Sequence, residues 1–185
     1  MGRRILIING NPDPSPSRLS AALADAYVHG ARRGGHEVRR IDIGALDFPP
    51  VLNGEDLDQE APAVIRDAQE AITWAEHITI IFPLWLGAPP ALMKSYFEQI
   101  CRYGFSFSHD LKPLLKGRTA RLIITMVLPN FVFRLMFAQG VKGFVRSVFW
   151  SSGIKPTRIL ALGKVMTAAK KPWLAQVEKL GERGI

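Results

Sequence analysis

The sequence has very little cysteine and no long apolar run free of charge. Cys101 is the only cysteine among 185 residues, so no intramolecular disulfide can form, and a lone thiol is more often packed in a core than used as a nucleophile. The most apolar stretch, residues 131–150, contains Arg134, Lys142 and Arg146, which argues against a membrane span. The apolar run after Arg4 is too short for a signal peptide. We therefore expect a cytoplasmic protein with no transmembrane segment.

The motifs of several common enzyme sites are missing as well. The segment NGNPDPSPSRLS has neither the glycine pattern of a dinucleotide-binding fold nor that of a phosphate-binding loop of ATPases. No GxSxG sequence is present, and the four histidines do not have the spacing of metal ligands. No RNA-binding aromatic signature, zinc-finger spacing or basic heptad region occurs. We therefore expect no bound metal and no nucleic-acid partner.

Acidic residues are scarce in the second half of the chain. Residues 1–76 contain 8 Lys or Arg against 12 Asp or Glu, whereas residues 77–185 contain 16 against 4, for a net charge of +8. Such a basic surface can attract nucleic acid, an anionic membrane or a phosphorylated cofactor, and charge alone does not choose among them. With 48% hydrophobic and 22% charged residues, the composition is typical of one soluble domain over residues 1–185.

Short aliphatic segments alternate with helical patterns along the chain. The segments with the composition of strands are residues 5–8, 36–43, 77–85, 120–128 and 158–163. Helical spacing occurs in residues 18–34, 62–75, 91–103, 131–150 and 173–183. This alternation predicts an α/β fold, a doubly wound five-stranded parallel sheet with helices on both faces. Because only five strands are expected, we predict the order 2-1-3-4-5.

In such a sheet a ligand binds outside the carboxyl ends of the strands, between the first and third strands. After the first strand, Ser15, Ser17 and Arg18 precede a helix whose free N–H groups favour a phosphate, although either serine could simply cap that helix. After the third strand, Trp85 could lie against a flat ring or pack in the core. After the fourth, Thr125 could close the same site or continue the strand.

Three motifs carry a resemblance to a known family. They are GNPDPSPSRLSAALADAY after the first strand, FPLWLGAPPALMKSYFEQI with GFSF after the third, and TMVLP after the fourth. Together they resemble the flavodoxin-like NAD(P)H:quinone oxidoreductases, the family of DT-diaphorase and the bacterial quinone reductases, from residue 5 to about residue 134. The resemblance implies a flavodoxin-like fold and non-covalent FMN or FAD. It also implies hydride transfer from NAD(P)H through flavin N5 to a quinone or similar electrophile.

The resemblance also assigns roles to residues of this chain. At the flavin phosphate it implies Ser17, Arg18 and Leu19; along the ring Leu84, Trp85, Leu86 and Gly87; and beside the pyrimidine side Thr125, Met126, Val127 and Leu128. Asn11, Ser15 and Pro83 are expected to bind the cofactor as well. Phe131 and Phe133 are implied nearest the flavin, in the substrate pocket. The chain departs from the family at Asn11, where histidine is usual, at Leu19, where asparagine is common, and at Val127 and Leu128, where the loop often has glycine. No catalytic acid or base is assigned.

The resemblance implies a homodimer, and the stretch 131–150 supports that expectation. Its apolar residues are too many for a single stripe facing the core, and a helix that is apolar over more than one face must bury more than one face. A flavodoxin-like electron carrier is an alternative, disfavoured by the charge of +8 because such carriers are usually acidic. A redox-sensing accessory subunit of a membrane transporter is another, since the basic half and this stretch would allow peripheral membrane contact.

Overall fold

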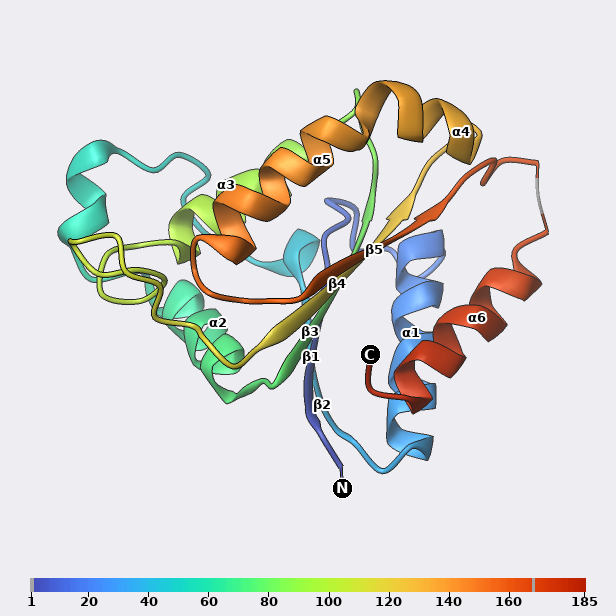
Figure 1. Cartoon of the computed structure of the whole chain (residues 1–185), viewed down its shortest axis with the longest axis horizontal. Helices are drawn as coiled ribbons and strands as arrows, with labels where there is room; N and C mark the ends of the chain where they lie inside the picture. Colours follow the sequence, from blue (N-terminus) through green and yellow to red (C-terminus); the bar gives the residue numbers. More distant parts are fainter. Residues whose placement is uncertain (1, 168) are drawn as a thin grey trace.

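The structure is a computed structural model that describes residues 2–167 and 169–185. A five-stranded parallel sheet with the order β2-β1-β3-β4-β5 forms its centre (Figure 1). The strands are β1 (Arg4–Asn9), β2 (Glu37–Asp42), β3 (His77–Pro83), β4 (Thr119–Thr125) and β5 (Thr157–Leu162). The predicted fold class and strand order are therefore confirmed. β3 and β4 end two and three residues earlier than predicted, because the chain turns sharply at Trp85 and leaves the sheet after Met126.

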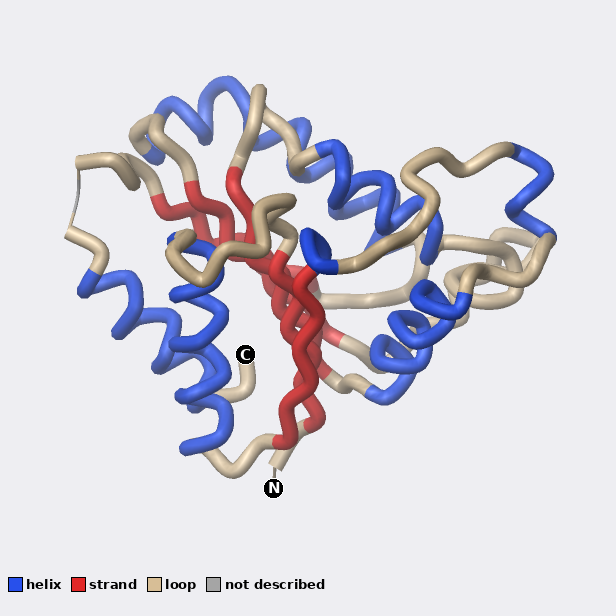
Figure 2. Tube along the Cα trace, turned by 180° about the vertical axis from the view of Figure 1, so that it is seen from behind, coloured by secondary structure: helices blue, strands red, loops and turns tan. Residues whose placement is uncertain are grey.

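Helices cover both faces of the sheet, as Figures 1 and 2 show from opposite sides. On one face lie α1 (Leu19–Arg33) and α6 (Lys171–Glu182), and on the other α2 (Ala63–Trp74), α3 (Ala91–Ile100) and the long helical segment 130–150. Short 3-10 turns, which the sequence did not predict, occupy Ile43–Ala45 and Gly54–Asp58. Of the helices in the two described ranges, none has both the length and the apolar character that a bilayer crossing requires.

α1 and α6 approach each other closely because glycines stand at their contact. A Cβ atom on Gly30 would lie 1.9 Å from the Glu178 carbonyl oxygen, and one on Gly181 would lie 2.2 Å from that of Tyr27. At the exposed side of the same contact, Arg33 forms ion pairs with Glu178 and Glu182. The layer of α1 and α6 is thus held by backbone contact and a small charge network.

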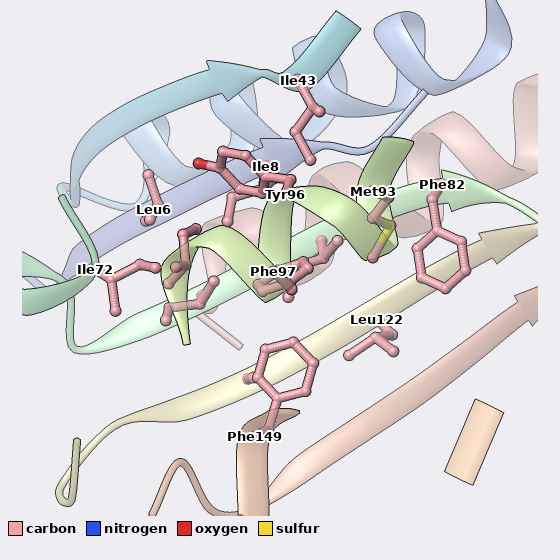
Figure 3. Packing of buried hydrophobic residues seen from close by; sticks show 14 of the residues in the cluster. Leu6, Ile8, Ile43, Ile72, Phe82, Met93, Tyr96, Phe97, Leu122 and Phe149 are labelled. Carbon is pink, nitrogen blue, oxygen red and sulfur yellow. The ribbon is translucent and has the colours of Figure 1, made fainter. Parts of the chain in front are cut away.

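The core of the opposite layer combines aliphatic side chains with aromatic rings (Figure 3). The Phe97 ring makes edge-to-face contacts with Tyr96, Phe144 and Phe149, with ring centroids 5.5–5.7 Å apart. Each such pair contributes roughly 0.5–1.5 kcal/mol beyond the burial of its surface. Rings from α3 and from the segment 130–150 therefore pack against each other within this core.

The segment 130–150 is one helix with two wider, π-helical turns. It consists of α4 (Asn130–Val132), a π turn (Phe133–Phe137), α5 (Ala138–Val145) and a second π turn (Arg146–Trp150). Its buried residues fall on every fourth position: Phe133, Val141, Val145 and Phe149, with Phe137 half-buried in the gap. In a regular α-helix this spacing drifts by roughly 40° per step, and the wider turns offset that drift. Phe131, Leu135 and Met136 are exposed at the start of the segment, and Trp150 is exposed at its end, beside Thr157 and Ile159 of β5.

Candidate functional site

The loops after β1, β3 and β4 meet at the carboxyl edge of the sheet, because these strands are parallel neighbours. The Gly10 amide donates to the Ile81 carbonyl at 2.8 Å, which ties the first loop to β3. The Leu84 amide donates to the Thr125 carbonyl at 2.8 Å, which ties the second loop to β4. The structure therefore brings together the three segments in which the sequence predicts a binding site.

Asn11 braces the first loop from within. Its Nδ2 donates to Ser20 Oγ at 2.8 Å, and its Oδ1 accepts the Asp13 amide at 3.1 Å. The residue is buried, so its polar atoms are used inside the loop. Asn11 therefore shapes the phosphate end of the site and offers little of itself to a ligand.

The start of α1 has the features of an anion site. Ser15 Oγ and Ser17 Oγ lie 2.9 Å apart near the surface, and neither hydroxyl caps the helix, since the cap position is Arg18 with no side-chain cap bond. The alternative that a serine merely caps α1 is therefore wrong. The amides of Leu19, Ser20 and Ala21 have no acceptor within the described residues. Unpaired amides at a helix start favour a bound anion.

Asp13 is an acid that the sequence analysis did not single out. Arg18 Nε donates to Asp13 Oδ2 at 2.6 Å, and the Ser15 amide donates to Asp13 Oδ1 at 2.9 Å. The Ser15 amide and the Arg18 guanidinium together hold the pKa of Asp13 below its usual range. Arg18 is thus already paired with an exposed carboxylate, and a phosphate bound here would have to share that arginine.

After β3 the chain makes a two-residue hairpin turn. The Trp85 amide donates to the Ala88 carbonyl at 3.0 Å and the Ala88 amide donates back at 2.9 Å. The two central residues, Leu86 and Gly87, have φ angles of 49° and 80°, as such a tight turn requires. The turn projects its side chains outward: Leu86 is fully exposed and Trp85 is 51% exposed. The alternative that Trp85 packs in the core is therefore wrong.

The turn after β3 rests on the long helix. A Cβ atom on Gly87 would lie 2.4 Å from the ring of Phe137, so only glycine permits this contact. The amides of Leu86 and Gly87 have no acceptor among residues 2–167 and 169–185. Preceding the turn, Pro83 and Leu84 are half-buried. The turn therefore offers a flat aromatic and apolar surface together with two free donors.

After β4 the chain divides into a buried and an exposed pair. Thr125 and Met126 are buried, and the Met126 amide donates to the Leu162 carbonyl at 2.9 Å, so both residues still belong to the sheet. Val127 and Leu128 are exposed at the edge. Contact with a ligand is therefore available from Val127 and Leu128, whereas the Thr125 and Met126 side chains form part of the support beneath.

Phe131 and Phe133 are separated by the helix that carries them. Phe131 is 70% exposed, whereas Phe133 is 5% exposed and belongs to the core cluster. Residues two positions apart on a helix face different sides, so the two rings cannot line one pocket. The prediction for Phe133 is corrected on this ground: its ring supports the helix.

Exposed apolar side chains gather on the segments that end at this edge. We call this set the apolar rim: Trp85, Leu86, Val127, Leu128, Phe131, Leu135 and Met136. Met166, which follows β5, is exposed as well, and no sequence motif marks it. Its loop is held near the site because the Val165 amide donates to the Met126 carbonyl at 3.1 Å. The three loops contain no histidine, and Asp13 is their only acid. The site thus combines unpaired amides with exposed apolar side chains, and its loops supply no side chain that titrates near neutral pH.

Known proteins resemble this chain over most of its length. An NAD(P)H oxidoreductase of Haemophilus influenzae, named as uncharacterized, is 27% identical over 128 residues, which cover 65% of this chain and 63% of that protein. FMN-dependent NADH:quinone oxidoreductase 8 of Burkholderia lata is 24% identical over 176 residues, which cover 86% of this chain and 82% of that protein. The chain spans only 57–63% of the length of three of the curated relatives it matches.

A solved structure and a family model agree with the architecture. The NAD(P)H:quinone oxidoreductase from Methanothermobacter marburgensis superposes with a TM-score of 0.83 at 18% identity, covering 99% of this chain and 97% of that one. This likeness concerns the fold. A family model described as a flavodoxin-like fold matches residues 3–182. With that match and the observed strand order, the chain belongs to the family of proteins with the flavodoxin-like fold.

Proposed function

We propose that this protein is a flavin-dependent oxidoreductase of the NAD(P)H dehydrogenase (quinone) type. In this proposal it takes a hydride from NAD(P)H and delivers it to a quinone or a similar electrophile. The observation that carries the proposal is one edge of the sheet that joins free amides at the start of α1 to an exposed aromatic turn at Trp85. The names of relatives that share the fold, an NAD(P)H oxidoreductase and an FMN-dependent NADH:quinone oxidoreductase, support it.

The residues at this edge fit FMN in both charge and shape. The phosphate would lie at the start of α1, against the Ser15 and Ser17 hydroxyls and the free amides of Leu19 to Ala21. The flat ring would lie along the turn Trp85–Gly87, whose unpaired amides can donate to its polar edge. FAD would need space for an additional adenylate, so mass identification of the released cofactor decides between the two.

A flavin bound here would supply reversible two-electron chemistry, which the side chains of this site lack. The chain's own residues would bind, orient and exclude water. Free amides in the turn after β3 are positioned to stabilise negative charge that develops at the ring edge. Exposed apolar residues of the rim, Val127, Leu128 and Phe131, would form the surface on which a nicotinamide and then a quinone bind.

We further propose that two copies of the chain associate through the long helix. Phe131, Leu135 and Met136 leave exposed apolar side chains close together at the start of this helix. An exposed apolar surface of this kind on a soluble protein marks an interaction site. A second subunit would cover it and would also enclose the apolar rim.

The decisive experiment is the absorption spectrum of the purified protein. A flavin spectrum, release of FMN on denaturation, and oxidation of NADH or NADPH that depends on an added quinone are the expected results. Steady turnover with a small quinone also distinguishes an enzyme from an electron carrier or a transporter subunit. A folded but colourless protein that neither FMN nor FAD can reconstitute would contradict the proposal.

A further inference from the structure

A second cavity lies at the amino edge of the sheet, where β3, β4 and β5 begin. Its volume is about 220 Å³, and it is lined by Arg3, His77, Thr119, Arg121, Arg158 and Ile185, together with Ala120 and Pro156. Figure 1 shows the C-terminal end of the chain beside the sheet, next to α1 and α6. This cavity is separate from the apolar rim, because it lies at the opposite ends of the same strands.

Arg121 is the central residue of this cavity. Its side chain projects from β4 and is only 8% exposed, yet its Nε has no hydrogen-bond acceptor in the described structure. In the register of the sheet Arg121 stands beside Arg158 of β5, so two guanidinium groups occupy neighbouring positions on one face. Like charges placed opposite each other in a sheet destabilise it.

The other polar groups around the cavity are donors as well. Arg3 Nη1 donates to the Gly184 carbonyl at 2.8 Å. His77 Nδ1 bonds to Thr119 Oγ1 at 2.7 Å, and its buried Nε2 has no partner in the residues that the structure describes. Burial, followed by the nearby arginines, lowers the pKa of His77 to about 3, so the ring is neutral at pH 7. In the tautomer that carries the proton on Nε2, Nδ1 accepts from the threonine hydroxyl and Nε2 is a donor.

No acidic side chain among the described residues pairs with these arginines; Ile185 also lines the cavity, and its carbonyl oxygen accepts from the Tyr27 hydroxyl at 3.2 Å. Within residues 2–167 and 169–185, neither Arg3, Arg121 nor Arg158 forms an ion pair with an acidic side chain, whereas other arginines such as Arg33 and Arg40 are paired. A buried guanidinium without an acceptor is costly, because it loses its hydration and gains nothing in return. The cost is removed if an anion occupies the cavity.

We propose that this cavity is a binding site for a small tetrahedral oxyanion of the phosphate or sulfate class. Arg121 and Arg158 would provide the main charge-assisted hydrogen bonds, with Arg3 and His77 Nε2 as further donors. The volume of about 220 Å³ is below the range of roughly 300–1,000 Å³ that is typical of pockets for organic ligands. The size of the cavity and its cluster of donors therefore suit a small free ion.

The test is a calorimetric titration of the flavin-saturated protein with inorganic phosphate, in chloride buffer at constant ionic strength. We expect one phosphate per chain. Arg121→Met should weaken binding roughly tenfold or more, because it removes charge-assisted hydrogen bonds, and Arg158→Gln should weaken it less. Arg32→Met is the matched control, since Arg32 is an exposed arginine of α1 that lines no part of this cavity.

A melting experiment supplies a second readout that a merely structural role would not reproduce. Without phosphate, Arg121→Met should melt above the wild type, because an unpaired buried charge is gone, and phosphate should raise the melting temperature of the wild type only. Wild-type protein that binds no phosphate at millimolar concentration would overturn the proposal. Unchanged affinity in a folded Arg121→Met protein would overturn it too.

Two further arms separate this site from other anion sites. AMP should bind no more tightly than phosphate, and tighter AMP binding would refute the assignment of a small free ion. The proposed flavin-phosphate site at the start of α1 lies at the opposite edge of the sheet, so Ser17→Ala/Arg18→Ala protein should keep its phosphate affinity at the amino edge. The proposal would be overturned if the double variant lost phosphate binding while Arg121→Met kept it. This outcome can be read whether or not the protein binds flavin.

Discussion

The two helical layers pack against the same sheet in different ways. In the layer of α1 and α6, glycines bring backbones into contact and arginine–glutamate pairs close the outer side. In the layer of α3 and the segment 130–150, aromatic rings fill the interior, and apolar side chains also remain on the outside. The first layer leaves no large apolar side chain exposed on α1 or α6, whereas the second leaves four on one helix.

The layer of α1 and α6 therefore exposes a mostly charged outer side, whereas the layer of α3 and the segment 130–150 exposes apolar side chains to which another molecule could bind. Charged residues on the outer side of α1 and α6 need no partner, because water and their ion pairs satisfy them. The outer side of the segment 130–150 is instead a candidate contact for a second copy of the chain. The proposed flavin site draws its phosphate end from the first layer and its apolar rim from the second.

Phe149→Ala should have the largest effect on stability. The ring is buried and contacts Phe97 and Phe144, so its removal leaves a cavity in the aromatic layer. We expect a loss of about 3–5 kcal/mol in the free energy of unfolding, measured by urea denaturation. Gln139→Ala, at an exposed position of the same helix, is the control and should change it by less than about 1 kcal/mol. Equal losses would contradict the assignment of the two sides.

Gly30→Val tests the layer of α1 and α6 in the same way. Its Cβ would overlap the Glu178 carbonyl oxygen, so the two helices would have to separate. We expect destabilisation of about 1–3 kcal/mol. Gly143→Ala provides the comparison, because a Cβ there meets nothing within 4 Å and the substitution favours the helix. A Gly30→Val protein as stable as wild type would show that this layer tolerates separation.

Much of the fold could be predicted from the sequence because its signals are local. The apolar run of β1 predicts a strand, and the helical spacing of α1 predicts a helix. Because parallel strands need right-handed helical crossovers and helices on both faces of the sheet, few strand orders are possible. The π turns could not be predicted, since they keep residues at every fourth position of the segment 130–150 facing the sheet, and this depends on how the helix packs there. Nor could the burial of Phe133, which depends on how the helix rotates against its neighbours.

The candidate site could be predicted at the level of loops but not of individual side chains. Parallel strands bring the loops after β1, β3 and β4 to one edge whatever their sequences. Whether Trp85 points outward depends on Leu86 adopting a positive φ, which is uncommon for leucine. The pairing of Arg121 with Arg158 joins residues far apart in the chain, and only the strand register reveals it.

Ser17→Ala/Arg18→Ala should weaken flavin binding at the phosphate end. The double change removes a hydroxyl and a guanidinium beside the free amides of α1, so we expect the dissociation constant of FMN to rise roughly tenfold or more. Fluorescence titration of apoprotein measures this effect, with Arg32→Ala on the outer side of α1 as control. Unchanged FMN affinity in a folded double variant would contradict the placement of the flavin phosphate at the start of α1.

Leu135→Asp/Met136→Asp should weaken the proposed dimer without damaging the core. Both residues are exposed, whereas Phe137 and Phe144 on the same helix are half-buried, so changes there would test folding instead. We expect the dimer dissociation constant to rise about tenfold, measured by light scattering over a dilution series. Gln139→Asp introduces a charge on the same helix without removing an apolar side chain. A wild-type protein that is monomeric at micromolar concentration and fully active would defeat this part of the proposal.

Asp13→Asn should have the smallest effect, in the opposite direction. The Asp13 carboxylate accepts from Arg18 and from the Ser15 amide, two groups that the proposed phosphate would use. Asparagine keeps the size of the side chain but removes the negative charge, so FMN should bind roughly two- to fivefold more tightly at low salt. Because this charge is exposed, the gain should shrink as ionic strength rises. Riboflavin, which has no phosphate, is the matched ligand and should bind both proteins equally. Weaker FMN binding by Asp13→Asn would mean that Asp13 holds the loop in its binding conformation and does not compete with the phosphate.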